Sequence, residues 1–232
     1  MSSFNYSATI YPSADGSGSS LLARVWTHTY PVPLVDGNVL EIPLTPLPGG
    51  QEAIALLMSN QCDFTVTHHL AGLMAEQAAV FQPDCIVAVP TMGLEYASLV
   101  AQKLGHAHYA AMGFSRKFWY DETFEEIRSS TSSSQIKRLY LDPHIQNRVR
   151  GKRVVIVDDV INTGASTFAA IRLLRKMGAE VAATVVALTE GRTWQTTLAE
   201  PSTAENATVK GVGHIPLFVK HEEGWVVNEA TI

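Results

Sequence analysis

One short stretch of this sequence, residues 154–167, constrains the fold more than any other. Three valines and an isoleucine occupy positions 154–157 and are followed at once by Asp158 and Asp159. A run of β-branched residues that ends in polar side chains is typical of a strand buried on both faces of a parallel sheet. Gly164 then precedes a segment with helical spacing of its apolar residues. We therefore predict a strand, a tight turn and a helix, with the two acids at the carboxyl edge of the sheet, where open α/β sheets bind ligands.

The turn after the acids has the composition of an anion-binding site. Its residues are Asn162, Thr163, Gly164, Ala165, Ser166 and Thr167. The free N–H groups and the positive dipole of a helix start attract anions, but the dipole alone contributes only ~0.3–1 kcal/mol for an exposed charge. Backbone donors and hydroxyls must therefore supply most of the affinity. An anion cradle beside two acids suits a ligand such as a ribose 5-phosphate. The alternative, in which the acids merely end a strand and a hydroxyl caps the helix, explains single residues better than the whole arrangement.

The rest of the chain alternates between strand-like and helix-like patterns. Helices are predicted over residues 51–59, 65–81, 94–104 and 165–177, and strands over residues 85–89, 153–157 and 181–188. This alternation implies an α/β core over residues 51–190, built on a mostly parallel sheet with helices on both faces.

The two ends of the chain differ from this core. Residues 1–50 are rich in Gly, Pro and Ser, and their prolines exclude a long helix. Residues 191–232 show no regular pattern apart from a possible strand at 215–219. We expect the N-terminal arm, the C-terminal tail, or both, to form a small hood on the core.

Residues 113–150 are polar and cationic between apolar elements. They contain a run of serines and threonines at 129–134 and the basic residues Arg116, Lys117, Arg128, Lys137, Arg138, Arg148 and Arg150. Long loops in compact domains often cover a binding site. We predict a flexible loop or hairpin with that role.

Composition excludes several classes of protein. The formal charge of −5 gives little support to a nucleic-acid partner, which usually meets a basic surface. The two cysteines, Cys62 and Cys85, are too few for a disulfide scaffold and are expected to be reduced thiols. No apolar stretch approaches the ~20 residues that cross a bilayer, and no signal peptide is recognised. We expect a cytoplasmic protein without a membrane partner.

Other ligand motifs are absent from the sequence. His68 and His69, and also His106 and His108, lack Cys or acid partners at a spacing typical of zinc sites, so no metal ligand from the protein is predicted. Neither a GxGxxG segment after a strand nor a Walker lysine motif occurs, which argues against NAD and ATP.

The segment 154–167 resembles the motif with which type I phosphoribosyltransferases bind 5-phosphoribosyl-1-pyrophosphate (PRPP). An apolar strand, two acids and a Thr-Gly turn stand in the same order. The resemblance implies that Asp158 and Asp159 hold the ribose hydroxyls and take part in catalysis. It also implies that the six turn residues, 162–167, bind the 5-phosphate.

The resemblance extends over about residues 60–190. Thr91, Met92 and Gly93 fall at the pyrophosphate loop of the family, which often contains a strained or cis non-proline peptide whose N–H groups face pyrophosphate. Adenine and orotate enzymes often have a cation just before the glycine, where this chain has Met92. Backbone donors are then the expected pyrophosphate ligands. An ordinary strand-to-helix turn is the equal alternative.

Arg116 and Lys117 are similar to the Arg-Lys pair that begins the catalytic loop of adenine- and orotate-type members. The resemblance implies that this loop closes over PRPP and brings positive charge to the departing pyrophosphate. A solvated basic loop is the alternative. Lys137 and Arg138 are weaker candidates for the same role.

The resemblance implies transfer of the phosphoribosyl group to a nucleobase, with Mg²⁺ held mainly by the oxygens of PRPP and with pyrophosphate as the leaving group. A homodimer is the usual form of the family. A purine, as in purine salvage, is the first acceptor expected, and a pyrimidine such as orotate is the second. The rival from another class is a non-catalytic PRPP-binding regulator, although no helix-turn-helix segment is recognised.

Overall fold

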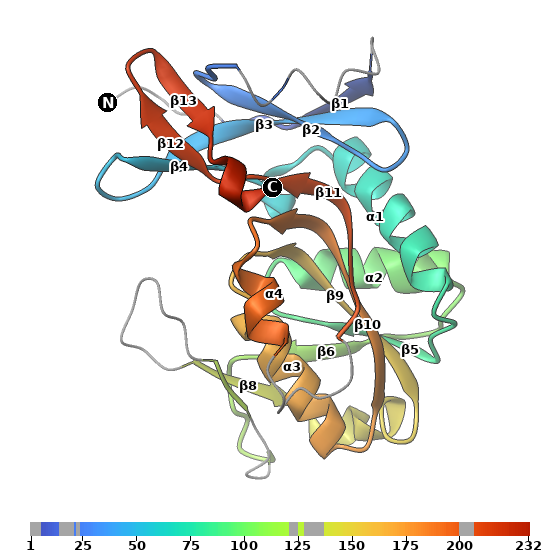
Figure 1. The fold of residues 1–232 in the computed structure, drawn as a ribbon. Coiled ribbons are helices and arrows are strands. Elements are labelled where there is room, and N and C mark those ends of the chain that lie inside the picture. The colour runs from blue at the N-terminus through green and yellow to red at the C-terminus, as the bar shows by residue number, and fades with distance from the viewer. Residues whose placement is uncertain (1–5, 14–20, 22–23, 121–124, 128–136, 200–206) are drawn as a thin grey trace.

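The computed structural model describes residues 6–13, 21, 24–120, 125–127, 137–199 and 207–232. Its main sheet contains β5 (Cys85–Ala88), β6 (Ala110–Gly113), β7 (Glu125–Ile127), β8 (Lys137–Leu141), β9 (Arg153–Ile161), β10 (Glu180–Glu190) and β11 (Val209–Ile215). The strand order is β11-β10-β9-β5-β6-β8-β7 (Figure 1). The five strands from β11 to β6 pair in parallel, whereas β8 pairs antiparallel with both β6 and β7. The α/β class predicted from the sequence is confirmed.

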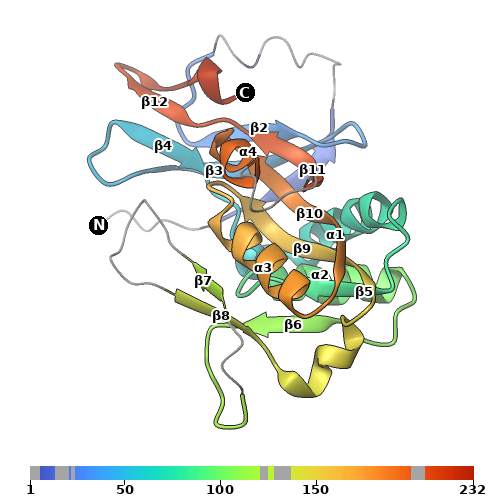
Figure 2. The same cartoon turned by 60° about the horizontal axis from the view of Figure 1, so that its bottom comes forward.

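Helices cover both faces of this sheet (Figure 2). They are α1 (Phe64–Ala79), α2 (Gly93–Lys103), α3 (Ala165–Lys176) and the short α4 (Thr193–Leu198). Successive residues of a strand point to opposite faces. Accordingly, Val155 and Val157 belong to the apolar cluster that includes α1 and α2, whereas Val154 and Ile156 belong to the cluster that includes α3. The branched residues of β9 therefore anchor helices on both sides.

Most of the predicted elements are present, but one predicted helix is a strand. The helices expected over 65–81, 94–104 and 165–177 are α1, α2 and α3, and the three expected strands are β5, β9 and β10. The helix predicted over 51–59 is wrong, because this segment forms β4 (Glu52–Ala55) and a 3₁₀ turn (Ser59–Gln61). Ala53 and Ala55 are buried while Glu52 is exposed, so the burial period is that of a strand.

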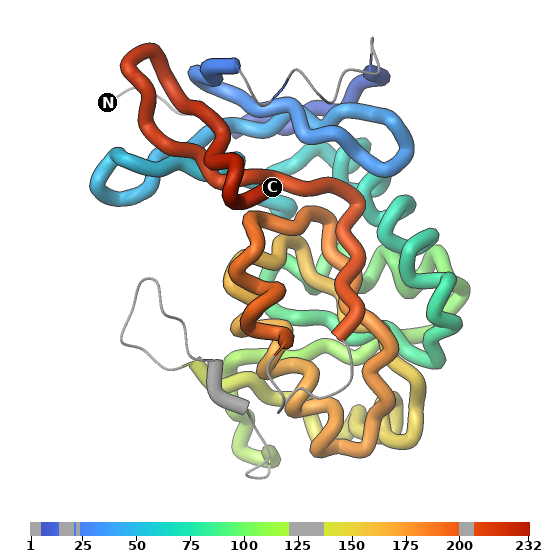
Figure 3. The backbone as a smooth tube through the Cα atoms, in the orientation of Figure 1, coloured from blue at the N-terminus to red at the C-terminus, as the bar shows by residue number. Residues whose placement is uncertain are grey.

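A second sheet combines both ends of the chain. It contains β1 (Thr9–Pro12), β2 (Thr29–Pro33), β3 (Asn38–Pro46), β4, β12 (Phe218–His221) and β13 (Gly224–Val227), in the order β1-β3-β4-β12-β13 with β2 paired to β3. The tube in Figure 3 shows the blue N-terminal strands and the red C-terminal hairpin in the same upper layer, and β12 pairs there with β4. Trp26 and Trp225 exchange backbone hydrogen bonds of 2.8 and 2.7 Å, which ties the two ends together.

The strand predicted at 215–219 is wrong in extent, because β11 ends at Ile215 and β12 begins at Phe218. The intervening Pro216 has no N–H to donate. β11 belongs to the main sheet and β12 to the second sheet, so the chain changes sheets at this point.

The turn between β2 and β3 packs on β11. Val35 N donates to Val212 O at 2.9 Å. A Cβ on Gly213 would lie 2.8 Å from Leu188 Cδ2 and 3.0 Å from Val32 Cγ1, so the approach leaves no room for a side chain. We call this contact the inter-sheet junction.

The predicted loop 113–150 contains a hairpin, since β7 pairs antiparallel with β8. Arg128 and the run 129–134 lie outside the described residues. Within the described ranges, no helix is both long and apolar enough to cross a bilayer.

Replacing Phe218 by alanine should destabilise the protein. Its ring is fully buried and packs edge-on against Tyr30, with centroids 4.9 Å apart. We expect a loss of about 3–5 kcal/mol in the free energy of unfolding, measured in urea. Phe64→Ala is the matched control, because Phe64 is 75% exposed and should cost less than about 0.5 kcal/mol. Equal losses in both variants would contradict the packing of β12 described above.

Candidate active site

Asp158 and Asp159 lie near the carboxyl end of β9, as the sequence predicts. Asp158 is buried and Asp159 is half-buried, and Asp159 N donates to Asp158 Oδ1 at 2.9 Å. Burial raises the pKa of Asp158 well above its ordinary range, and the neighbouring charge of Asp159 adds to this effect. Burial also raises the pKa of Asp159. Donors from a ligand, such as hydroxyl groups, would stabilise both carboxylates.

The turn before α3 depends on Gly164. Its φ of 79° lies in the left-handed region that favours glycine, and a Cβ there would lie 3.2 Å from Trp194 Cα. The first N–H groups of α3 have no acceptor within the helix. Ala165 N lies 3.4 Å from Thr163 Oγ1, which belongs to the turn before the helix. The predicted phosphate cradle is therefore at a helix start.

The six predicted phosphate ligands are not equally placed. Thr163, Ala165 and Ser166 are half-buried around the helix start. Thr167 is 2% exposed. Asn162 is exposed and directs its Nδ2 to Glu190 Oε2. Residues 163, 165 and 166 thus keep partly exposed surface at the helix start, and their role as phosphate ligands stays a prediction.

The predicted pyrophosphate loop touches the acids directly. The peptide bond between Pro90 and Thr91 is cis, a feature that the family resemblance predicts for this loop. Thr91 is exposed and Met92 half-buried, and α2 begins at Gly93. A Cβ on Gly93 would lie 2.8 Å from Asp158 Oδ1 and 2.9 Å from Val157 O. Two helix starts, those of α2 and α3, therefore lie beside the same pair of acids.

Arg116 and Lys117 are exposed on the segment after β6. Arg116 Nη2 donates to Tyr120 O at 3.3 Å, within the same segment. Trp119 Nε1 donates to the carboxylate of Asp142, at 3.2 and 3.3 Å. The catalytic role of the pair stays a prediction.

Lys137 and Arg138 begin β8. Lys137 Nζ lies 5.5 Å from the centre of the Phe114 ring. Both side chains are exposed at the hairpin, and their role in the loop is likewise a prediction.

Glu190 is a residue that the sequence analysis missed. It ends β10, is 5% exposed, and accepts a hydrogen bond from Asn162. Burial raises its pKa to about 7, the hydrogen bond from Asn162 opposes this, and the charge of Asp159 adds to it. The signal in the sequence was an acid two residues after the apolar run 181–188, near the carboxyl end of a predicted strand.

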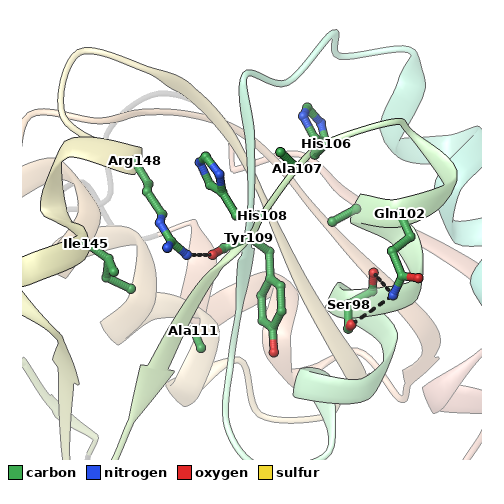
Figure 4. Close-up of a pocket in the computed structure, with 10 residues that line it drawn as sticks. Ser98, Gln102, His106, Ala107, His108, Tyr109, Ala111, Ile145 and Arg148 are labelled. Carbon is green, nitrogen blue, oxygen red and sulfur yellow. Dashed lines mark hydrogen bonds between the residues drawn. The ribbon is translucent and has the colours of Figure 1, made fainter.

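A cavity of about 480 Å³ lies elsewhere, beside the second half of α2 and the segment that enters β6 (Figure 4). Its lining includes His106, His108 and Arg148, and Arg148 Nη1 donates to Tyr109 O at 2.7 Å. None of the predicted site residues lines it. Within the part of the chain that the structure describes, no three His, Cys, Asp or Glu side chains gather as a metal site.

Replacing Gly93 by alanine should disrupt the contact between the loop and the acids. The new Cβ would meet Val157 O and two atoms of Asp158 at less than 3 Å, two of the three being backbone atoms, so the loop or β9 must shift. We expect a loss of about 1–3 kcal/mol in stability and at least a tenfold loss of PRPP affinity, measured by urea unfolding and calorimetry. Gly72→Ala in α1 is the control, since its nearest contact is 3.9 Å. Unchanged PRPP affinity in Gly93→Ala would oppose this geometry.

The buried acids should make stability depend on pH. The pKa of Glu190 is about 7 when folded, against an ordinary value of 4.5, so the folded protein binds more protons between these values. The stabilising contribution is therefore full below pH 4.5 and is lost as pH rises through 7. Glu190→Gln should remove this loss, and the variant should gain up to about 3 kcal/mol over wild type between pH 5 and 8 in urea unfolding. A constant difference across this range would contradict the assignment.

Comparison with known proteins connects this geometry to a family. Among curated proteins, the orotate phosphoribosyltransferase of Pyrobaculum aerophilum is 36% identical over 109 residues, which cover 47% of this chain and 46% of that enzyme. The adenine phosphoribosyltransferase of Thermotoga maritima is 28% identical over 138 residues, covering 60% of this chain and 69% of the enzyme. The chain thus matches under half of the length of the orotate enzyme.

Solved structures share the fold. Adenine phosphoribosyltransferase from Thermoanaerobacter pseudethanolicus has a TM-score of 0.53 at 18% identity, over 66% of this chain and 82% of that one. The Trypanosoma brucei enzyme, solved with AMP, pyrophosphate and ribose-5-phosphate, has a TM-score of 0.53 at 15% identity, over 66% and 65%.

The sequence profile of the phosphoribosyl transferase domain matches residues 64–212, which run from the start of α1 into β11. This match includes the acids, both helix starts and Glu190. Because it covers more than half of the 232 residues, the chain belongs to the phosphoribosyl transferase domain family.

Proposed function

We propose that this protein transfers the phosphoribosyl group of PRPP to a nucleobase and releases pyrophosphate. The supporting observation is the contact of Gly93 with Asp158, which brings two helix starts to one pair of acids. A single anion site would suit any phosphate. Two anion sites that flank two hydroxyl-binding carboxylates suit a ribose with a phosphate at one end and a pyrophosphate at the other.

In this proposal the turn before α3 binds the 5-phosphate through its N–H groups, and Asp158 and Asp159 accept hydrogen bonds from the ribose hydroxyls. The start of α2 faces the pyrophosphate. Its backbone donors stabilise the charge that develops on the leaving group, because Met92 supplies no positive charge. Arg116 and Lys117 would add that charge when their loop closes.

Mg²⁺ fits this site. The carboxylates of Asp158 and Asp159 are hard oxygen donors of the kind that Mg²⁺ prefers, and they would hold the ribose hydroxyls or waters that the ion also binds. When bound, the ion would neutralise pyrophosphate charge as the bond to ribose breaks.

We propose that the second sheet is the hood. It lies beyond the carboxyl ends of β10 and β11, where β11 leads into β12 (Figure 1). Tyr6, before β1, and Met58, after β4, meet here, since Met58 N donates to Tyr6 Oη at 2.9 Å. Such a cover would exclude water from the reacting atoms.

A purine is the preferred acceptor and orotate the second, in keeping with the adenine and orotate enzymes among the relatives. We also propose a cytoplasmic homodimer. The rival function is a PRPP-binding regulator without catalysis. Met92, in place of a cation in the pyrophosphate loop, is the observation that favours this rival.

The decisive experiment measures pyrophosphate release from PRPP and Mg²⁺ with adenine, hypoxanthine, guanine, xanthine, uracil and orotate separately. We expect release with at least one base. Asp158→Asn combined with Asp159→Asn should abolish both release and PRPP binding, because the ribose hydroxyls lose charged acceptors, while circular dichroism stays unchanged. PRPP binding without release for every base would support the regulator. A folded double variant that binds PRPP normally would refute the site.

A further inference from the structure

Glu190 is a buried acid without a role in the proposal above. Asp158 and Glu190 are the charged side chains that are buried in the described part of the chain. No Lys or Arg there forms an ion pair with Glu190. Burying a carboxylate without a cation is costly, so a protein that needs only a folded core would gain by replacing it. A buried acid in this position, near Asp159, suits a ligand that donates hydrogen bonds to it.

The strand order fixes the side of the site on which Glu190 lies. β9, with the two ribose-binding acids, has β5 on one side and β10 on the other. The loop after β5 carries Thr91–Gly93, and the end of β10 carries Glu190. A direct displacement at ribose C1 needs the acceptor opposite the departing pyrophosphate. Glu190 is therefore on the acceptor side, an argument that rests on the proposed function.

One carboxylate oxygen of Glu190 is already used. Oε2 accepts from Asn162 Nδ2, which fixes the orientation of the side chain. Oε1 accepts no hydrogen bond from the described residues. A carboxylate oxygen binds N–H donors and repels other anions. The charge of Asp159 nearby makes the local field more negative still.

His214 does not offset this field. His214, on β11, has its Nδ1 2.9 Å from Thr189 Oγ1 and its Nε2 3.1 Å from Thr231 O. The carbonyl requires the proton on Nε2, and the hydroxyl can donate to Nδ1, so both nitrogens are satisfied in the neutral ring. Arg192 is exposed, and its charge helps to lower the pKa of His214.

We propose that Glu190 binds the acceptor base through its N–H groups and thereby selects neutral, N–H-rich bases over anionic ones such as orotate. Asn162 is the positioning residue for this contact. A ring N–H or exocyclic amino group donates to Oε1, whereas the carboxylate of orotate is repelled. This assigns the acceptor class of the site to purine-like bases.

The test compares wild type, Glu190→Gln and Glu180→Gln with PRPP, Mg²⁺ and each of adenine, guanine, hypoxanthine and orotate. Glu180 begins the same strand and is exposed in an ion pair with Arg153, so its variant is the matched control. We expect wild type to prefer a neutral base, and Glu190→Gln to lower kcat/KM for that base about 10–100-fold, the size of a charged hydrogen bond. The KM for PRPP should change less than threefold, and Glu180→Gln should match wild type.

Orotate as the best acceptor of wild type, or an equal loss in the KM for PRPP, would overturn the role of Glu190 while leaving the proposed function intact. Absence of turnover with every base would count against the proposed function instead. In that case, calorimetry of the same bases with the PRPP-loaded protein tests Glu190 directly. Preferential binding of a neutral base that weakens in Glu190→Gln supports the assignment, and orotate preference or no base binding refutes it.

Discussion

The carboxyl end of β9 and the loop after β5 approach so closely that only glycine fits between them. Gly93 rests against Val157 O and Asp158, and α2 starts at this same residue. The contact sets the distance between the two helix starts and holds Asp158 out of water. A strand buried on both faces makes the approach possible. The apolar cluster that includes α1 and α2 packs on one face of β9, and the cluster that includes α3 packs on the other. The proposed ligand geometry follows from this single packing constraint.

What the sequence predicts well is what short-range patterns determine. The strand, acids, turn and helix of residues 153–176 follow one another in the chain, so composition and periodicity suffice to find them. The second sheet could not be found this way, because Ala53 pairs with Phe218 and Trp26 with Trp225. Glu190 was missed for a related reason. Only the strand order, which is a tertiary property, places the end of β10 beside Asp159 and Asn162.

The buried acids of the site lower the stability of the folded protein when they are ionised. Burial raises the pKa of Asp158, Asp159 and Glu190, so keeping these three groups ionised in the folded protein costs free energy. Binding sites often sacrifice stability in this way, since groups arranged for a ligand are left incompletely paired without it. A ligand that brings hydroxyl and N–H donors would return part of that free energy as affinity.

The inter-sheet junction has a consequence for how the chain is made. The first four strands are synthesised before the core, yet the sheet that they belong to is completed by β12 and β13, which follow the core in the chain. The parallel strand β11, on which the turn between β2 and β3 rests at Gly213, is also a late product. β1 to β4 can pair with one another, but the edge of β4 that pairs with β12 stays open until β12 has been made, and open edges of this kind are where nascent chains aggregate or recruit chaperones.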